Sequence, residues 1–216
     1  MQLFFTYVVF GGICMKKNLV ITLERQYGSG GLEIGKLVAQ KLGIPCYNQE
    51  ILEKAAETCN IPEEYLESTQ ENVSQSFLYQ LSMASKTGRS PESFQSKSSI
   101  LYSEIVKIIN DMAKQGSCVI IGRCGDYILR DFDPSMHVFI YSKMENRRKR
   151  VVEELGVSQE TAEYIIRKND KRRESFYNGN TNHTWGIKEH YNLCLNSGIY
   201  DIEKCADMII DAIKYL

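Results

Sequence analysis

Residues 19–35 read LVITLERQYGSGGLEIG, and this stretch decides the fold. Its apolar, β-branched start is typical of a buried parallel strand. Three glycines then fall within four positions, and a helical pattern follows whose apolar residues share one face: Ile34, Leu37, Val38 and Leu42. Gly43 stands where a helix C-cap belongs. The stretch predicts a phosphate site, because bare N–H groups line such a turn and the helix dipole adds positive charge.

The glycine turn departs from the usual phosphate loop. That loop ends in Gly-Lys-Ser/Thr, with the lysine on the β- and γ-phosphates and the hydroxyl on magnesium. Aligned through the helix, Gly31 and Leu32 occupy these two positions. Arg25 is the closest cation in sequence that could replace the lysine, and Ser29 is the candidate hydroxyl for Mg²⁺. The alternative is a strand-to-helix turn that needs glycine only for its backbone angles, but the flanking strand and helix favour the phosphate interpretation.

The run from Ile21 to Gly35 resembles the opening motif of the cytidylate kinase-like family, and the resemblance extends from about Lys16 to the C-terminus. Members of that family are similar to nucleoside monophosphate kinases but carry a lysine-free glycine loop. The resemblance implies an α/β fold, a three-layer P-loop kinase-like domain with a five-stranded parallel sheet flanked by helices. It also implies transfer of the γ-phosphoryl of ATP, with Mg²⁺, to a small acceptor such as CMP. The residues that would cradle the donor phosphates are Gly28, Ser29, Gly30 and Gly31.

A second motif follows the apolar run Cys118–Ile121, which we predict to be a strand. This strand delivers Gly122 and Arg123 to its carboxyl end, where open α/β sheets bind ligands. In cytidylate kinases a Gly-Arg-Asp at this place holds the monophosphate acceptor, so the resemblance assigns acceptor binding to Arg123. Asp126 lies two residues later than the family's aspartate. The alternative is a strand-end arginine in a surface ion pair.

Positive charge is concentrated in residues 143–173, which contain ten Lys or Arg against six Asp or Glu in a chain of net charge -1. On the predicted helix, Arg167, Asp170 and Arg173 form one stripe. The resemblance implies a lid at residues 157–180, in which Arg167, Arg172 and Arg173 close over the transferred phosphates. Asp170 would orient these arginines. Phosphoryl transfer needs positioning and charge neutralisation, and guanidinium groups provide both. The alternative is a solvated basic helix face.

The 216 residues predict one kinase-like domain at 16–216, preceded by an N-terminal extension at 1–15 that we expect to lie outside the fold. The polar segment 60–98 is either an acceptor-binding insertion or a surface excursion. The apolar run near the N-terminus is too short to span a bilayer, so we expect no membrane partner. Seven cysteines without a C-x-x-C pair predict reduced thiols in a cytoplasmic protein.

Two other functions are compatible with these motifs. The chain could be a nucleotide-binding module of the same fold without catalysis, because the lysine and the hydroxyl of the usual loop are absent. It could also bind nucleic acid through residues 143–173, but Tyr164 is the only aromatic residue among these arginines and the rest of the chain is acidic. We therefore expect a small-molecule nucleotide substrate, and the sequence leaves the oligomeric state open.

Overall fold

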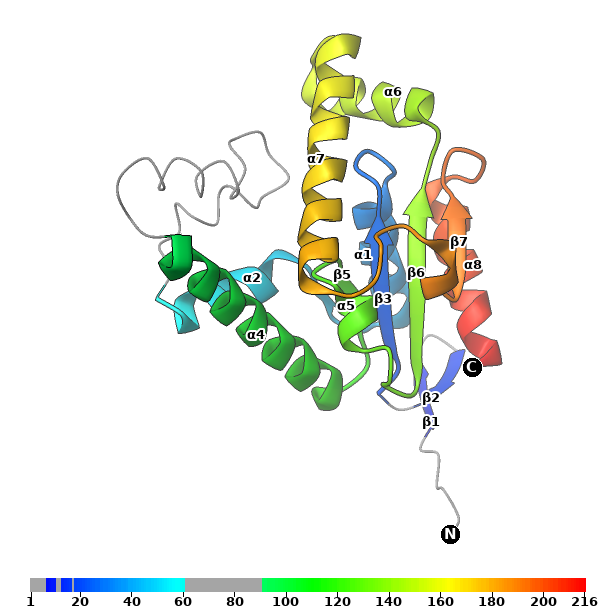
Figure 1. Ribbon diagram of the computed structural model, residues 1–216. Helices are drawn as coiled ribbons and strands as arrows, with labels where there is room; N and C mark the ends of the chain where they lie inside the picture. The colour runs from blue at the N-terminus through cyan, green and yellow to red at the C-terminus, as the bar shows by residue number, and fades with distance from the viewer. Residues whose placement is uncertain (1–6, 11–12, 17, 61–90) are drawn as a thin grey trace. The chain divides into compact units, whose positions relative to one another are not determined.

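Five parallel strands form the sheet, in the order β4-β5-β3-β6-β7 (Figure 1). The central strand β3 (Val20–Arg25) is buried along its whole length and pairs with β5 on one side and β6 on the other. The remaining strands are β4 (Cys46–Tyr47), β5 (Cys118–Ile121), β6 (Ser135–Tyr141) and β7 (Leu193–Asn196). The glycine turn follows the C-terminal end of β3. It therefore lies at the carboxyl edge of the sheet, where such folds bind ligands.

The structure is a computed structural model that describes residues 7–10, 13–16, 18–60 and 91–216. The chain divides into two units, one made of residues 1–47 and 111–216 and the other of residues 48–110. The second unit contains α2 (Gln49–Thr58) and most of α4 (Pro91–Gln115), each with a row of buried apolar residues. Most of the predicted acceptor segment 60–98 lies outside the described residues, so its role stays a prediction, as does the single-domain assignment.

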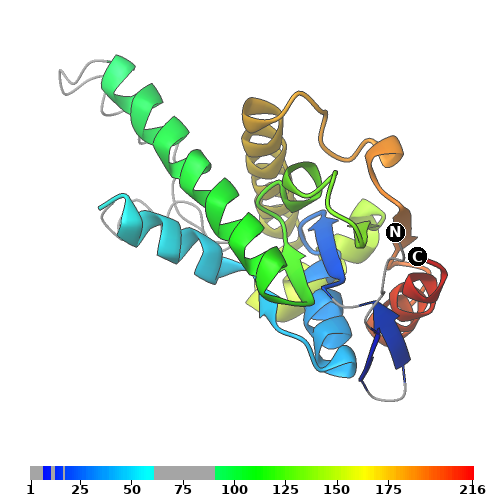
Figure 2. The same ribbon diagram turned by 90° about the horizontal axis from the view of Figure 1, so that it is seen from below.

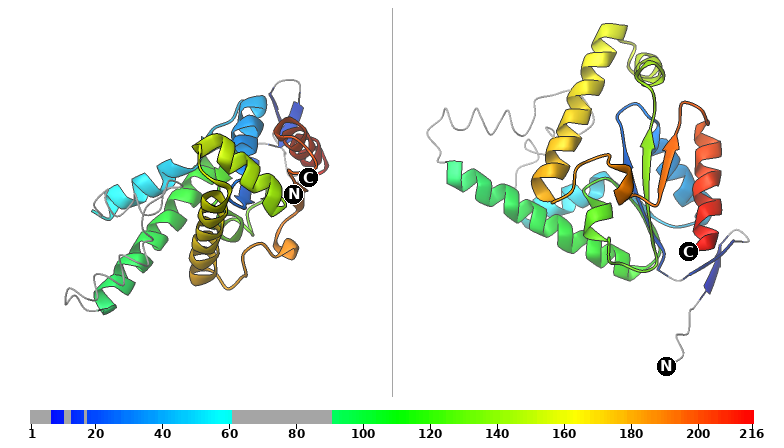
Figure 3. Two further views of the ribbon diagram at one scale, coloured as in Figure 1. Left: turned by 90° about the horizontal axis from the view of Figure 1, so that it is seen from above. Right: turned by 45° about the vertical axis from the view of Figure 1, so that its right-hand side comes forward.

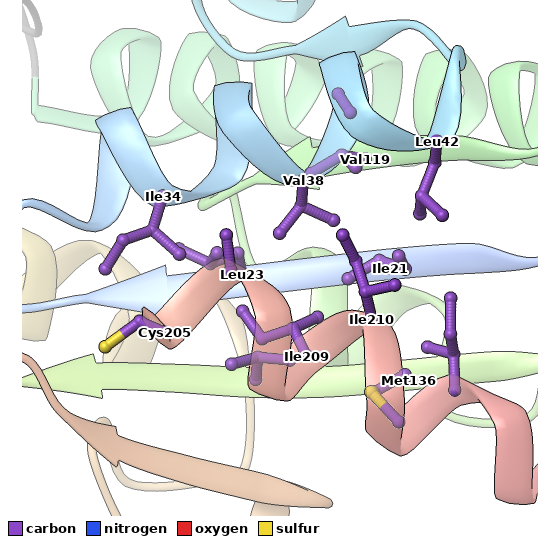
Figure 4. Close-up of a cluster of buried hydrophobic side chains, with 14 of the residues drawn as sticks. Ile21, Leu23, Ile34, Val38, Leu42, Val119, Met136, Cys205, Ile209 and Ile210 are labelled. Atoms are coloured by element: carbon purple, nitrogen blue, oxygen red, sulfur yellow. The ribbon is translucent and has the colours of Figure 1, made fainter. Parts of the chain in front are cut away.

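One face of the sheet packs against α1 (Gly31–Leu42) and α8 (Ile202–Ala212), which lie side by side (Figures 1 and 3). Alternate residues of β3 point to this face, as the two-residue period of a strand requires. Figure 4 shows Ile21 and Leu23 of β3 between Ile34 and Val38 of α1 and Ile209 of α8. The five-stranded parallel sheet flanked by helices that the sequence predicts is present in the described residues.

Helices α6 (Met144–Leu155) and α7 (Gln159–Asn180) lie across the carboxyl edge of the sheet (Figure 1; Figure 3, left). A second apolar cluster joins them to the glycine turn, because Tyr27 packs among residues of both helices: Val151, Ala162, Ile165 and Ile166. The predicted lid segment is therefore packed directly on the turn that follows β3. A short helix, α5 (Gly125–Ile128), follows β5 and lies against β3.

The N-terminal residues that the structure describes form a hairpin of β1 (Tyr7–Phe10) and β2 (Ile13–Lys16), a sheet separate from the five-stranded one. Figure 2 shows this hairpin beside the C-terminal end of the chain, where β2 lies near η4 (Ile213–Tyr215). That residues 1–15 are an extension outside the kinase-like domain stays a prediction. Among the described residues, no helix combines the length and apolarity that crossing a bilayer requires.

Candidate functional site

The backbone carbonyl groups of the glycine turn are all engaged. Each carbonyl from Arg25 to Gly30 accepts a hydrogen bond, in most cases from a distant part of the chain. The donors are Arg173 Nη1 to Arg25 (2.8 Å), Ser29 Oγ to Gln26 (2.7 Å), Arg147 Nη1 to Tyr27 (3.3 Å), Arg150 Nη1 to Gly28 (3.1 Å), Ser197 Oγ to Ser29 (2.5 Å) and the Ile34 N–H to Gly30 (3.0 Å). The acceptor capacity of the turn is thus directed into the protein.

The N–H groups of the turn are in the opposite situation. Within the described part of the chain, no acceptor receives a hydrogen bond from the N–H of Gly28 or Gly30, or from the first three residues of α1, residues 31–33. Five donors that have no acceptor among the described residues lie together at the positive end of a helix. Since orphan backbone donors at a helix N-terminus favour an anion, the turn has the chemistry of a phosphate site.

Glycine is required at two positions of the turn. Gly28 and Gly30 have φ of 71° and 76°, a left-handed conformation that residues with a side chain rarely adopt. A Cβ atom on Gly28 would lie 2.9 Å from Val151 Cγ2 and 3.0 Å from the Arg147 carbonyl oxygen, so α6 approaches the turn directly. A Cβ atom on Gly30 would lie 2.7 Å from Arg150 Nη1. The guanidinium of Arg150 therefore lies against the turn beside its unpartnered N–H groups.

Arg25 fills the place that the missing lysine would need. A Cβ atom on Gly31 would lie 2.5 Å from Arg25 Cβ and 2.8 Å from Arg25 Cγ, so the stem of Arg25 crosses the first residue of α1. The side chain is buried and its guanidinium reaches the backbone of Gly122 at the end of β5. Arg25 thus lies between the glycine turn and the Gly122–Arg123 motif, the two segments that the sequence predicted to bind donor and acceptor.

Two of the four predicted lid residues contact the glycine turn, one lies at the surface and one is half-buried. Asp170 and Arg173 contact the turn, because Asp170 Oδ1 accepts from the Tyr27 N–H at 2.7 Å and Arg173 donates to the Arg25 carbonyl. Arg167 instead pairs with Glu163 on the exposed side of α7, at 2.7 Å. Arg172 is half-buried, and burial lowers its pKa.

Several contacts of the turn come from residues that the sequence did not single out. Arg147 and Arg150 of α6 were part of a basic run, and their spacing of three residues places both on one helical face. That spacing is the one signal that could have separated them from their neighbours. Ser197, after β7, carried no signal of this kind. Arg147, Arg150 and Arg173, three of the ten basic residues of segment 143–173, donate to carbonyls of the turn and so are used inside the protein, which weakens the nucleic-acid alternative.

Arg123 lies in a left-handed turn at the carboxyl end of β5. Gly122, Arg123 and Cys124 have φ of 71°, 56° and 57°, and the turn closes with a hydrogen bond from the Gly125 N–H to the Gly122 carbonyl at 3.0 Å. Left-handed backbone costs ~1–2 kcal/mol for each residue with a side chain. The fold holds this strain at the edge where ligands bind, a position typical of functional residues.

Two buried carboxyl groups lie beside this turn. Glu24 accepts a hydrogen bond from Trp185 Nε1 at 2.8 Å, and Asp126 accepts one from the Tyr177 hydroxyl at 2.6 Å. Burial, and next the Glu24 carboxylate, raises the pKa of Asp126 to about 7. Burial also raises the pKa of Tyr177 and Tyr191. These residues connect β3, α5 and the C-terminal end of α7. Of them, the sequence analysis considered only Asp126, beside the motif that would bind the phosphoryl acceptor.

The magnesium assignment of Ser29 has little geometric support. Ser29 is fully buried, and its hydroxyl donates to the Gln26 carbonyl at the base of the turn. No group of three or more His, Cys, Asp or Glu side chains able to hold a metal occurs among the residues that the structure describes. The donor set of the turn therefore fits an anion, and these side chains form no preorganised metal site.

Comparisons with solved structures agree with this architecture. An uncharacterized protein from Eubacterium ventriosum ATCC 27560 is 26% identical, with a TM-score of 0.70 over 92% of this chain and 99% of that one. Shikimate kinase from Acinetobacter baumannii in complex with shikimate is 13% identical, with a TM-score of 0.50 over 91% and 93%. Shikimate kinase from Bacteroides thetaiotaomicron is 14% identical, with a TM-score of 0.50 over 91% and 98%. A comparison with curated proteins gave no match.

The two shikimate kinases are similar in fold alone, since their sequences differ from this one at most positions. The family model gives the stronger result. It matches residues 20–199, a range that contains the glycine turn, the Gly122–Arg123 motif, α6, the predicted lid helix α7 and Trp185. The resemblance drawn from the sequence is thereby confirmed: the chain belongs to the cytidylate kinase-like family.

Proposed function

We propose that this protein transfers the γ-phosphoryl group of ATP to a small acceptor, most plainly a nucleoside monophosphate such as CMP. The family and the fold support a kinase-type phosphotransferase. The observation that carries the proposal is the division of polar groups at the glycine turn, where the carbonyls are engaged and five N–H groups have no acceptor among the described residues. A cytoplasmic location, where ATP is available, belongs to the same proposal.

The proposed roles follow from position. Gly28, Ser29, Gly30 and Gly31 hold the donor phosphates through their backbone. Arg25, buried between this turn and Gly122, neutralises charge on the group in transfer, and Arg123 binds the acceptor. Guanidinium groups suit both tasks, because phosphoryl transfer depends on positioning and on stabilising charge spread over oxygens. One charge-assisted contact is worth ~1.5–3 kcal/mol, so a well-placed arginine can offset much of the missing lysine.

Arg167, Arg172 and Arg173 are proposed to close over the phosphates, with Asp170 as their orienting carboxylate; Asp170 and Arg173 already contact the turn. Mg²⁺ generally accompanies ATP in kinases of this fold and is held largely by phosphate oxygens and water. Since Ser29 is buried and engaged with Gln26, no step of the proposal depends on a metal bound to its hydroxyl.

The test is turnover of an acceptor panel with ATP and magnesium, measured by a coupled ADP assay. The panel contains the nucleoside monophosphates, and also shikimate, because one structural neighbour is a shikimate kinase in complex with that compound. ADP release that depends on one acceptor supports the proposal. ATP binding without turnover on any acceptor would replace it with the non-catalytic nucleotide-binding module.

Arg25→Ala separates these two functions further. In a kinase this variant should lose turnover far more than ATP affinity, because the guanidinium lies toward the acceptor side of the turn. In a binding module only the affinity can change. A third outcome, affinity for single-stranded nucleic acid that falls steeply with salt, would favour the nucleic-acid function instead.

A further inference from the structure

We infer that Arg147, held by Asp170, and Ser197 are positioning residues that aim two particular N–H groups of the glycine turn, those of Gly28 and Gly30, at a bound polyphosphate. The inference rests on the proposed function and adds residues that would not touch the ligand themselves. Arg147 belongs to α6 and Asp170 to α7, whereas Ser197 follows β7. All three act on the backbone of a turn more than a hundred residues away in sequence.

Each peptide unit couples the direction of a carbonyl to that of the following N–H group. In a trans peptide the C=O of one residue and the N–H of the next lie in one plane and point in opposite directions. The N–H of Gly28 belongs to the same unit as the Tyr27 carbonyl, and the N–H of Gly30 to the same unit as the Ser29 carbonyl. A hydrogen bond that fixes either carbonyl therefore fixes the direction of an N–H group that has no acceptor of its own.

The need for such bonds comes from the composition of the turn. Glycines at positive φ give their peptide planes more freedom than other residues have, so planes in this turn can reorient at low cost. A reoriented plane would present a carbonyl oxygen to the anion in place of an N–H. In the usual phosphate loop a lysine adds a positive charge at the β- and γ-phosphates, so a carbonyl that turns toward the anion weakens binding less. Without it, the direction of each N–H matters more.

Arg147 and Asp170 enclose the backbone of Tyr27. The Tyr27 N–H donates to Asp170 Oδ1 at 2.7 Å, and the Tyr27 carbonyl accepts from Arg147 Nη1 at 3.3 Å. The same guanidinium pairs with the other oxygen of Asp170 at 2.5 Å, and the two side chains are 7% and 19% exposed. A buried pair of this kind has few alternative arrangements, because leaving either charge unpaired is costly. Tyr27 is thereby held from both sides, and its carbonyl points toward Arg147 of α6.

Ser197 fixes the peptide unit that carries the second N–H group, that of Gly30. Its hydroxyl is buried and donates to the Ser29 carbonyl at 2.5 Å, across 168 residues of sequence. A second carbonyl, that of Tyr141, lies 3.3 Å away, but a hydroxyl has one hydrogen to donate and the shorter contact takes it. The peptide between Ser29 and Gly30 is thus fixed by a residue of a different strand.

The experiment is a titration of the ¹⁵N-labelled full chain with tripolyphosphate, followed by amide spectra and by calorimetry. Ser197→Ala removes one hydroxyl and no charge. Arg147→Met combined with Asp170→Asn removes the donor to the Tyr27 carbonyl, leaves no single buried charge and keeps an amide oxygen for the Tyr27 N–H. Arg148→Met is the matched control, because Arg148 joins α6 to Glu163 of α7 at 3.1 Å away from the turn.

In the wild-type chain, the amide protons of Gly28 and Gly30 should move downfield as the anion binds. Ser197→Ala should reduce the response of Gly30 and leave that of Gly28, whereas the double variant should do the reverse. Each should weaken tripolyphosphate binding by about 5- to 30-fold, the factor that ~1–2 kcal/mol produces, and Arg148→Met should stay near wild type. A merely structural role would not produce this residue-by-residue correspondence.

Two results would overturn the inference. Unchanged responses of both glycines in both variants would mean that these bonds do not aim the N–H groups. Equal loss of both responses in each variant would mean that the turn loosens as a whole. If the wild-type chain binds no tripolyphosphate, the failure belongs to the proposed function, and the inference that rests on it falls with it.

Discussion

Replacement of Gly31 by alanine should change the sign of its effect on stability according to what stands at position 25. In the wild-type chain the new Cβ would lie 2.5 Å from Arg25 Cβ and 2.8 Å from Arg25 Cγ. Both partners are the rigid base of a buried side chain, which cannot swing away as the end of a flexible one does. Overpacking of this kind costs ~1–3 kcal/mol. Gly31→Ala should therefore destabilise the protein.

In an Arg25→Gly background the same substitution should stabilise. The stem that causes the clash is gone, and the nearest remaining atom is Ile140 Cβ at 3.4 Å, which is ordinary contact. Gly31 is the first residue of α1 and does not have positive φ, so alanine gains the helix preference that glycine lacks, at most ~1 kcal/mol. The coupling free energy between the two positions should thus be ~2–3 kcal/mol in magnitude, at the upper end for residues in contact.

The measurement is a double-mutant cycle in chemical denaturation, with wild type, both single variants and the double variant. Arg25→Gly on its own loses buried contacts, but the cycle subtracts that loss. The reasoning is refuted if Gly31→Ala has the same sign in both backgrounds, since Arg25 would then not occupy the space that a side chain at position 31 needs. The cycle requires no ligand, so it tests the packing independently of any activity.

Three further predictions use the same turn and its surroundings. Arg150→Ala should weaken tripolyphosphate binding about tenfold in calorimetry, because the guanidinium lies against Gly30 and donates to the Gly28 carbonyl, whereas exposed Lys149→Ala should change it little. Gly28→Ala should destabilise the fold by at least ~1 kcal/mol in thermal unfolding, because it combines positive φ with contact to α6. Asp126 binds its proton up to a pH of about 7 in the folded chain, but only to about 4 when unfolded. Its contribution to stability therefore falls as pH rises from 4 to 7, and Asp126→Asn should remove up to ~1.4 kcal/mol of that loss per pH unit.

The fold was largely predictable because its signals are local. The run before the glycine turn is mostly apolar from Leu19 to Leu23, as expected of a strand covered on both faces, and β3 is the central strand. Gly43 takes the left-handed conformation at the end of α1 and bonds back to the last turn of the helix, as its position predicted. Helix α5 was not predicted, because it depends on three consecutive left-handed residues of which only Gly122 carries a local signal.

The candidate site was predictable in part, and the division has a physical cause. Glycine spacing identifies a turn and a helix N-terminus, since both are properties of adjacent residues. Which arginine reaches that turn depends on how α6 and α7 pack, and helical periodicity defines faces without saying what each face meets. Arg167 and Arg173 share one predicted stripe, yet one pairs with Glu163 at the surface and the other donates to the Arg25 carbonyl. Tertiary packing decides between them.

Helices α6 and α7 are both coupled to the glycine turn, and this limits how far the predicted lid, residues 157–180, can move. Four hydrogen bonds join the helices to the turn, from Arg147, Arg150 and Arg173 to carbonyls and from the Tyr27 N–H to Asp170. At ~1 kcal/mol each, separating the helices from the turn would cost ~4 kcal/mol before the apolar cluster around Tyr27 is counted. Such a state would be populated roughly once in a thousand molecules. The parts of α6 and α7 that carry these bonds and the Tyr27 cluster, including Ile165 and Ile166 next to Arg167, are therefore expected to stay with the turn when a substrate binds.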